Sequence, residues 1–168
     1  MKLIFDKFSS LFERATFEGD DDEELRRAMA VLIVHTCAID GAVDNREATQ
    51  RDVILKEHFG LDDVTLKSVV ADAEKRDGEA TDLYEFTSVI TRLLDQSGRK
   101  DFIRMLWEIV LADGRIDAYE ANLVWRLAEL IGVSTRDRVN LRQQVEDSLA
   151  RSNGDGKPAK NTSGEKNG

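Results

Sequence analysis

The stretch VLADGRIDAYE, residues 110–120, decides the fold, because CAIDGAVDNRE at residues 37–47 repeats its pattern 73 positions earlier. Each copy ends a nearly all-apolar segment and begins an amphipathic one, which closes with a glycine, Gly60 or Gly132. An apolar segment, a D-G-x-(V/I)-D-x-x-E turn, a second segment and a closing glycine therefore occur twice. Such repetition predicts two helical hairpins related by a pseudo-two-fold axis.

The rest of the sequence also has helical periodicity. The single proline is Pro158, so residues 1–157 lack the residue that most strongly interrupts helices. The apolar segments, residues 25–39 and 102–111, have hydrophobic side chains around the whole helical wheel and are expected at the centre of a bundle. Apolar spacing predicts further helices over residues 2–15, 45–59, 63–76, 82–95, 118–131 and 135–150. We therefore expect an all-α, compact bundle of seven to eight helices.

The expected helical domain covers residues 22–151, with a distinct segment on either side. Residues 1–15 predict an N-terminal amphipathic helix with three phenylalanines, which need a surface to pack against. The aromatic face of residues 3–12 can cover the bundle, join two copies in a homodimer, or lie in a membrane interface. Residues 152–168 contain no large apolar side chain, which predicts a disordered tail.

Composition excludes several classes of protein. With 33 acidic and 24 basic residues, the net charge of -9 repels phosphate and argues against a nucleic-acid partner. No apolar run reaches the roughly 18 residues of a membrane-spanning helix. Charged residues follow too early for a signal peptide, so we expect a cytoplasmic protein. Cys37 is the only cysteine, and its apolar neighbours predict a buried, unreactive side chain.

Each D-G-x-(V/I)-D-x-x-E turn gathers three carboxylates. The second aspartate and the glutamate are spaced as a helix cap and its partner. The leading aspartate is harder to explain, because the carboxyl end of a helix disfavours an anion. If the two turns face each other, their carboxylates could converge on a hard cation such as calcium or magnesium. The predicted metal ligands are Asp113, Asp117 and Glu120 in the second turn and Asp40, Asp44 and Glu47 in the first.

The turn is similar to the second half of an EF-hand calcium loop, but the first half is missing. The first two ligand positions would fall at Ile109 and Leu111, inside an apolar helix. The turn therefore predicts an acidic cation site weaker than an EF-hand, or no cation site. The histidines, His35 and His58, lack zinc-binding spacing, and no nucleophile elbow or glycine-rich phosphate loop is present. We therefore do not expect an enzyme, and we expect His35 to be buried and hydrogen-bonded.

The doubled turn, with the closing sequence LIGVS at residues 130–134, resembles the tellurite-resistance TerB family over about residues 22–150. The resemblance implies a bundle of about seven helices with pseudo-two-fold symmetry and an acidic surface that binds metal. It also implies a role in stress or tellurite response near membrane-associated partners. The first copy departs from the family pattern, because it has Ile39 where the second has alanine.

The sequence thus predicts a non-enzymatic acidic binding module that holds a divalent cation or a basic protein partner. Its expected setting is a stress-response or envelope-associated assembly, in the cytoplasm or peripherally at the inner face of the membrane. The alternative is a purely structural protein–protein adaptor that uses the N-terminal aromatic helix. In that alternative the acidic turns serve only as helix caps.

Overall fold

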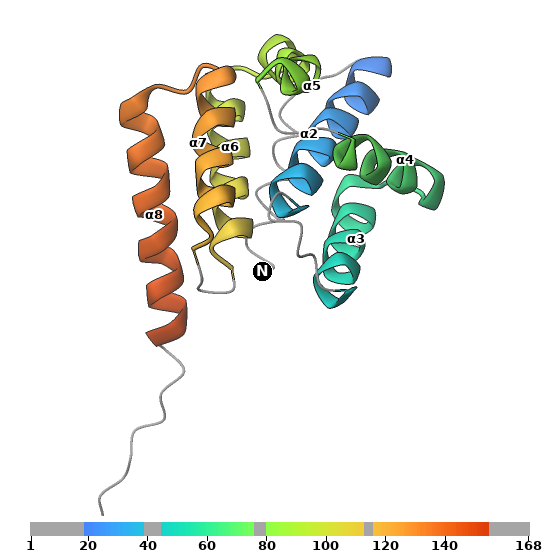
Figure 1. The fold of residues 1–168 in the computed structure, drawn as a ribbon. Helices are drawn as coiled ribbons and strands as arrows, with labels where there is room; N and C mark the ends of the chain where they lie inside the picture. Colours follow the sequence, from blue (N-terminus) through green and yellow to red (C-terminus); the bar gives the residue numbers. More distant parts are fainter. Residues whose placement is uncertain (1–18, 39–44, 76–79, 113–115, 155–168) are drawn as a thin grey trace, which may run out of the picture.

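The computed structural model describes residues 19–38, 45–75, 80–112 and 116–154, and these residues form seven helices and no strands. Figure 1 shows the helices in chain order from α2 to α8. Their bounds are α2 Asp20–Ala38, α3 Asn45–Phe59, α4 Asp63–Glu74, α5 Ala80–Leu93, α6 Gln96–Val110, α7 Ala118–Leu130 and α8 Thr135–Gly154. The all-α prediction is confirmed.

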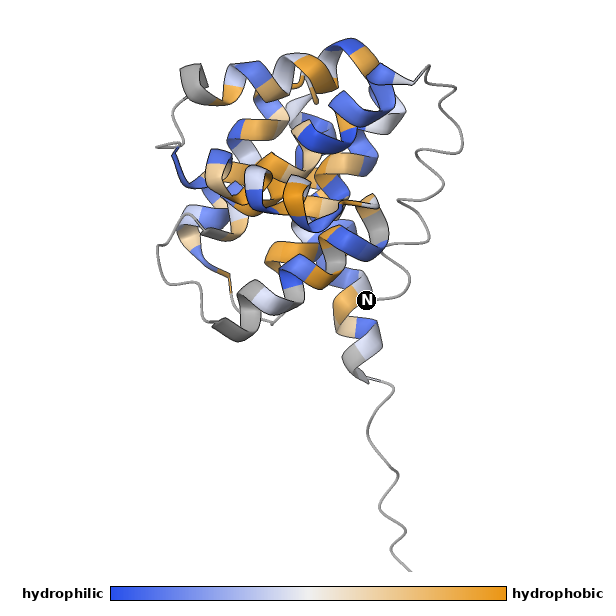
Figure 2. Cartoon of the chain, turned by 90° about the vertical axis from the view of Figure 1, so that its right-hand side faces the viewer, coloured by the Kyte–Doolittle hydropathy of each residue, from blue (hydrophilic) through white to orange (hydrophobic). Residues whose placement is uncertain are grey.

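Helix α2 lies at the centre of the first half of the chain. Every residue of α2 from Ala28 to Thr36 is buried. Helices α4 and α5 pack closely along α2, and helices α3, α6 and α7 also contact it. In the second half, α6 takes the corresponding place between α7 and α8 and buries Phe102, Ile103 and Trp107. Figure 2 shows the hydrophobic residues concentrated where the helices face one another. The prediction that both apolar segments form central helices is therefore confirmed.

The helices form two sets of three, which we call the first unit (α2, α3 and α4) and the second unit (α6, α7 and α8), with α5 between them. In each unit the second helix is followed by a glycine with positive φ, 63° at Gly60 and 75° at Gly132. A polar side chain then caps the third helix: Asp62 accepts from the Thr65 amide at 2.7 Å, and Ser134 accepts from the Asp137 amide at 3.2 Å. These shared features agree with the predicted repeat, which the fold does not by itself establish.

In each unit an arginine of the first helix binds the end of the second helix, and the sequence had not pointed to either residue. In the first unit Arg26 of α2 donates to the carbonyl oxygen of Phe59, the last residue of α3, at 3.4 Å. In the second unit Arg99 of α6 donates to the carbonyl oxygen of Ile131 at 3.3 Å. Arg26 and Arg99 are separated by the same 73 positions as the two acidic turns, so the repeat offset itself could have identified them.

The predicted helix boundaries agree with the structure to within two residues at most ends, but α2 begins five and α6 six residues before the predicted apolar segments, and α8 ends four residues later than predicted. That helix continues to Gly154, so residues 152–154 are helical and the prediction of a tail from 152 was wrong at its start. The predicted N-terminal helix over residues 1–15 and the remainder of the predicted tail lie outside the described residues.

Candidate cation-binding turn

The second acidic turn is described from Ile116 onward. Asp117 is the N-cap of α7, as predicted, with extended backbone at φ -76° and ψ 129°. Its Oδ1 atom accepts both available amides, from Tyr119 at 2.7 Å and from Glu120 at 3.1 Å. Within the part of the chain that the structure describes, no hydrogen bond or ion pair is found at the second oxygen, Oδ2. The cap contacts that the structure describes therefore use one carboxylate oxygen of Asp117.

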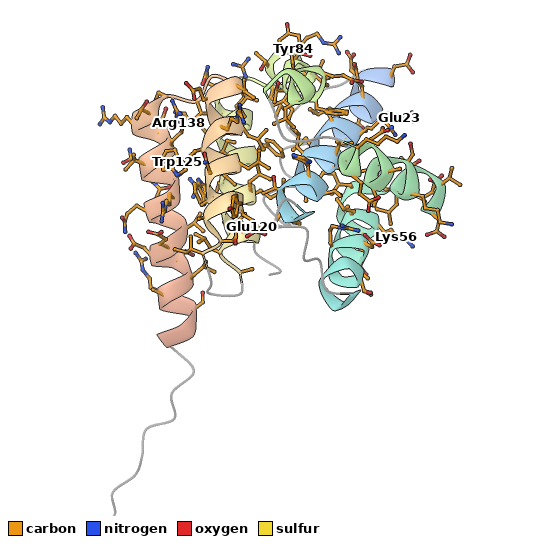
Figure 3. All side chains as sticks on the ribbon, viewed as in Figure 1. Glu23, Lys56, Tyr84, Glu120, Trp125 and Arg138 are labelled. Atoms are coloured by element: carbon orange, nitrogen blue, oxygen red, sulfur yellow. The ribbon has the colours of Figure 1, made fainter. Side chains whose placement is uncertain are left out.

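The side chains around Asp117 expose the start of α7 to solvent. Glu120, one turn into the helix, is half-buried, and Figure 3 shows it toward the end of α7 that begins at Ala118. Ile116 and Tyr119 are 54% and 69% exposed, which are high values for large apolar side chains. An anion at a helix N-terminus is also favoured by the helix dipole.

Most of the other predicted ligands are not placed by the structure. Asp113, Asp40 and Asp44 lie outside the described residues, and Glu47 is in α3 with its side chain outside them. The convergence of six carboxylates therefore stays a prediction. Among the described side chains, no three or more histidines, cysteines, aspartates or glutamates are grouped in a way that could hold a metal ion.

His35 is buried and hydrogen-bonded, as predicted, whereas Cys37 is less buried than predicted. His35 is 5% exposed, and its Nδ1 atom lies 3.2 Å from the carbonyl oxygen of Ala73 at the end of α4. Because a carbonyl only accepts, Nδ1 carries the proton and His35 joins α2 to α4. Its Nε2 atom is buried with no hydrogen-bond partner among the described groups. Cys37 is half-buried and packs against the core.

A groove between α3 and α4 is a second surface feature, and the sequence analysis did not find it. The groove has a volume of about 320 Å³ and a floor that includes Leu66 and Val70. On its rim Lys56 forms an ion pair with Asp63. The hydrogen bond between them and the charge of the partner raise the pKa of Lys56 and lower the pKa of Asp63. The residues that line the groove are Arg51, Asp52, Lys56, Asp63, Leu66, Lys67, Val70, Ala71 and Glu74.

The described helices contain none that is long and apolar enough to cross a membrane. The model of one protein family, described as tellurite resistance protein TerB, matches residues 26–143, which is more than half of the chain. The matched region begins within α2 and ends within α8, so it includes both units and both acidic turns. No curated protein and no solved structure matches the chain.

Proposed function

The chain belongs to the TerB family, and we propose that it is a non-enzymatic binding module whose acidic turns hold a divalent cation or a basic protein partner. The observation that carries the proposal is the geometry of Asp117. Its Oδ1 atom alone satisfies the two amides of the α7 cap, so ligation through Oδ2 would not disturb the helix. Asp113 and Glu120 are the proposed companions of Asp117, with Asp40, Asp44 and Glu47 of the first turn in support.

Carboxylate oxygens at the start of a helix are suitable ligands for a hard cation. Calcium and magnesium both prefer oxygen ligands, and calcium tolerates irregular geometry and additional water molecules. A turn with few protein ligands is expected to bind weakly, in the range of about 10⁻⁴ to 10⁻³ M that is found for low-affinity calcium modules. The net charge of -9 adds a long-range attraction for cations.

The test is thermal unfolding of the full chain with and without calcium or magnesium. A cation that binds only the folded state raises the melting temperature by mass action, and at about ten times the dissociation constant the rise is a few degrees. Asp113→Asn should abolish the rise and leave the melting temperature without cation nearly unchanged. If the wild-type protein shows no rise at millimolar cation, the cation hypothesis is wrong.

Glu23→Gln is the matched control for these experiments. Glu23 is exposed in the first turn of α2, and Figure 3 shows it on a part of the molecule remote from Glu120. The substitution removes the same unit of charge as Asp113→Asn. A cation effect that comes only from overall charge would weaken equally in both variants, whereas a site at the turn would be lost only in Asp113→Asn.

A basic protein partner is the second candidate occupant, and the charge distribution favours it. Helix α2 begins with Asp20, Asp21, Asp22 and Glu23 in its first turn, which adds to the net negative charge of the chain. A pentalysine peptide serves as the probe. If the turn recognises a basic partner, pentalysine should raise the melting temperature at low salt, lose this effect at about 0.5 M salt, and fail with Asp113→Asn.

The family description supports a role in the response to tellurite or related stress. We propose that the chain acts there in the cytoplasm or peripherally at the inner face of the membrane. A strain that lacks the chain should be more sensitive to tellurite, and the wild-type sequence should restore resistance. Asp113→Asn should fail to restore it if the acidic turn is the functional part, whereas restoration by this variant would separate the turn from the physiological role.

A further inference from the structure

Two tryptophans close the second unit where its three helices meet. Trp107 of α6 and Trp125 of α7 have ring centroids 5.8 Å apart at an interplanar angle of 75°, an edge-to-face contact. The guanidinium of Arg142 in α8 lies 5.4 Å from the centre of the Trp107 ring. Figure 3 shows Trp125 and Arg138 where α7 and α8 face each other. Aromatic rings therefore fill the space between the second and third helices of this unit.

The first unit has small side chains at the matching positions. The repeat offsets of 73 and 72 residues align Trp107 with Val34 and Trp125 with Val53. They also align Arg142 with Val70, so no ring and no long side chain is available at these three positions. The groove of about 320 Å³ lies between α3 and α4, the helices that correspond to α7 and α8. Of these three valines only Val70 lines the groove, and Val34 is fully buried, so the groove shares with the tryptophan cluster its place between the second and third helices but not its lining positions.

The groove is apolar at its base and nearly neutral at its rim. Leu66, Val70 and Ala71 are the apolar residues that line it. The rim has two ion pairs, in each of which the opposite charges neutralise each other. Arg51 contacts Asp52 at 2.8 Å, and Lys56 contacts Asp63. A strongly charged polymer would gain little here, whereas an amphipathic segment with aromatic side chains would bury apolar surface on both sides.

The chain itself contains such a segment immediately before α2. Residues 2–15 carry Phe5, Phe8 and Phe12 within a stripe of apolar residues, together with three basic and two acidic side chains. Only residues 16–19 separate this segment from α2. A tether of that length gives an effective concentration in the millimolar range, provided that the segment can reach the groove.

The start of α2 lies beside the helices that form the groove. Arg26 donates to the last carbonyl oxygen of α3, and Arg27 contacts Ser68 and Asp72 of α4. We propose that residues 2–15 dock in the α3–α4 groove of their own chain, with phenylalanine rings against the apolar lining residues Leu66, Val70 and Ala71. This placement buries the aromatic face that the adaptor alternative would use.

The test measures proximity by chemical cross-linking in the full chain. Cysteines replace Ser10 and Lys67 in a Cys37→Ala background, and a short bis-maleimide joins them. Lys67 lines the groove and is exposed, so a docked segment brings the two cysteines together. The matched control pairs Ser10→Cys with Val139→Cys, because Val139 aligns with Lys67 in the repeat and is 54% exposed on α8.

Docking predicts that the Ser10→Cys and Lys67→Cys pair forms an intramolecular cross-link at least about ten times faster than the control pair. Equal rates would overturn the proposal. A covalent dimer as the main product would place the segment in the groove of a second copy and would overturn docking within one chain. Circular dichroism verifies that each variant keeps its helical content.

A second pair of substitutions tests whether the aromatic rings hold the segment in the groove. Phe8→Asp in the Ser10→Cys and Lys67→Cys protein should lower the cross-linking rate to that of the control pair. Ser9→Asp adds the same charge one position away and should leave the rate unchanged. A rate that survives Phe8→Asp would show that the ring does not anchor the segment and would overturn the proposal. None of these results depends on cation binding at the acidic turn.

Discussion

Arg99 illustrates how one side chain fixes the ends of two helices. Its guanidinium donates to the carbonyl oxygens of Thr91 and Leu94 at the end of α5 and to Ile131 at the end of α7. The last carbonyls of a helix have no partner within the helix, and a cation is also favoured there by the dipole. The sequence predicted the turn residues around Gly132, and the repeat offset could have singled out Arg99, but its carbonyl partners could not be predicted, because they are set by the tertiary fold.

Replacing Arg99 should destabilise the fold. Arg99→Lys keeps the charge but cannot reach three carbonyls at once, so we expect the free energy of unfolding to fall by about 1–3 kcal/mol. Urea unfolding followed by tryptophan fluorescence measures this, since both tryptophans lie in the second unit. Arg151→Lys, at an exposed position in the last turn of α8, is the control and should change little. Equal stability of all three proteins would contradict the assigned role of Arg99.

The start of α8 should make stability depend on acid pH. Hydrogen bonds from Lys100 and Ser134 hold the pKa of Asp137 below its ordinary value. Because the pKa is lower in the folded state, this carboxylate contributes stability above about pH 3.9, which is lost as the pH falls through the folded-state value. Asp137→Asn should therefore show a smaller loss of melting temperature between about pH 5 and 2 than the wild type.

Asp147→Asn is the control for the acid titration, because Asp147 is exposed on α8 and its amide replacement can still accept from Gln143. This variant should keep the wild-type acid profile. If Asp137→Asn and Asp147→Asn lose melting temperature in parallel with the wild type, the contacts of Asp137 with Lys100 and Ser134 do not contribute to the stability of the folded state.

At the scale of elements, α7 and α3 differ although they occupy matching places in the two units. Helix α7 buries five apolar side chains, among them Leu123, Val124 and Ala128. The repeat aligns these three with Arg51, Asp52 and Lys56 of α3, which line the groove instead. Periodicity predicted both helices correctly, because each keeps a deeply buried residue such as Leu55 or Leu127. It did not predict the groove, since the groove depends on how α3 and α4 pack against each other.

The cap of α7 predicts effects of different size on stability for two substitutions of Asp117. Asp117→Ala removes the acceptor for two amides and should lower the free energy of unfolding by about 1 kcal/mol. Asp117→Asn keeps an acceptor oxygen and should change stability by a few tenths of a kcal/mol, because asparagine is also a favoured N-cap residue. Denaturant titration measures both values. Similar destabilisation by the two variants would contradict the capping geometry.

At the closing glycines of both units, we expect any side chain to lower the stability of the fold. Gly60 and Gly132 have φ values of 63° and 75°, and a Cβ atom would meet nothing closer than Arg99 at 3.6 Å. Replacement by alanine should therefore cost about 1–2 kcal/mol at each position through backbone conformation alone. Gly154→Ala at the end of α8, where φ is not positive and nothing lies within 4 Å, is the control and should not destabilise the protein.

At the scale of the whole molecule, the sequence predicted the all-α bundle, its central helices and most helix ends, because these depend on local periodicity and caps. The arrangement of Asp40 and Asp44 relative to Asp113 could not be predicted, since it depends on how the two units pack. The same holds for His35, whose burial was predicted but whose partner, Ala73, is 38 positions away. Long-range pairs of this kind are set by tertiary packing.

Equilibrium dialysis of the full chain against calcium measures whether the acidic turn before α7 binds a divalent cation, as we propose. We expect saturable binding with a dissociation constant at or below about 10⁻³ M. Binding should be lost in Asp117→Asn, which keeps the helix cap, and retained in Glu23→Gln. Absence of saturable binding to the wild-type protein, or equal binding by all three proteins, would contradict the proposal.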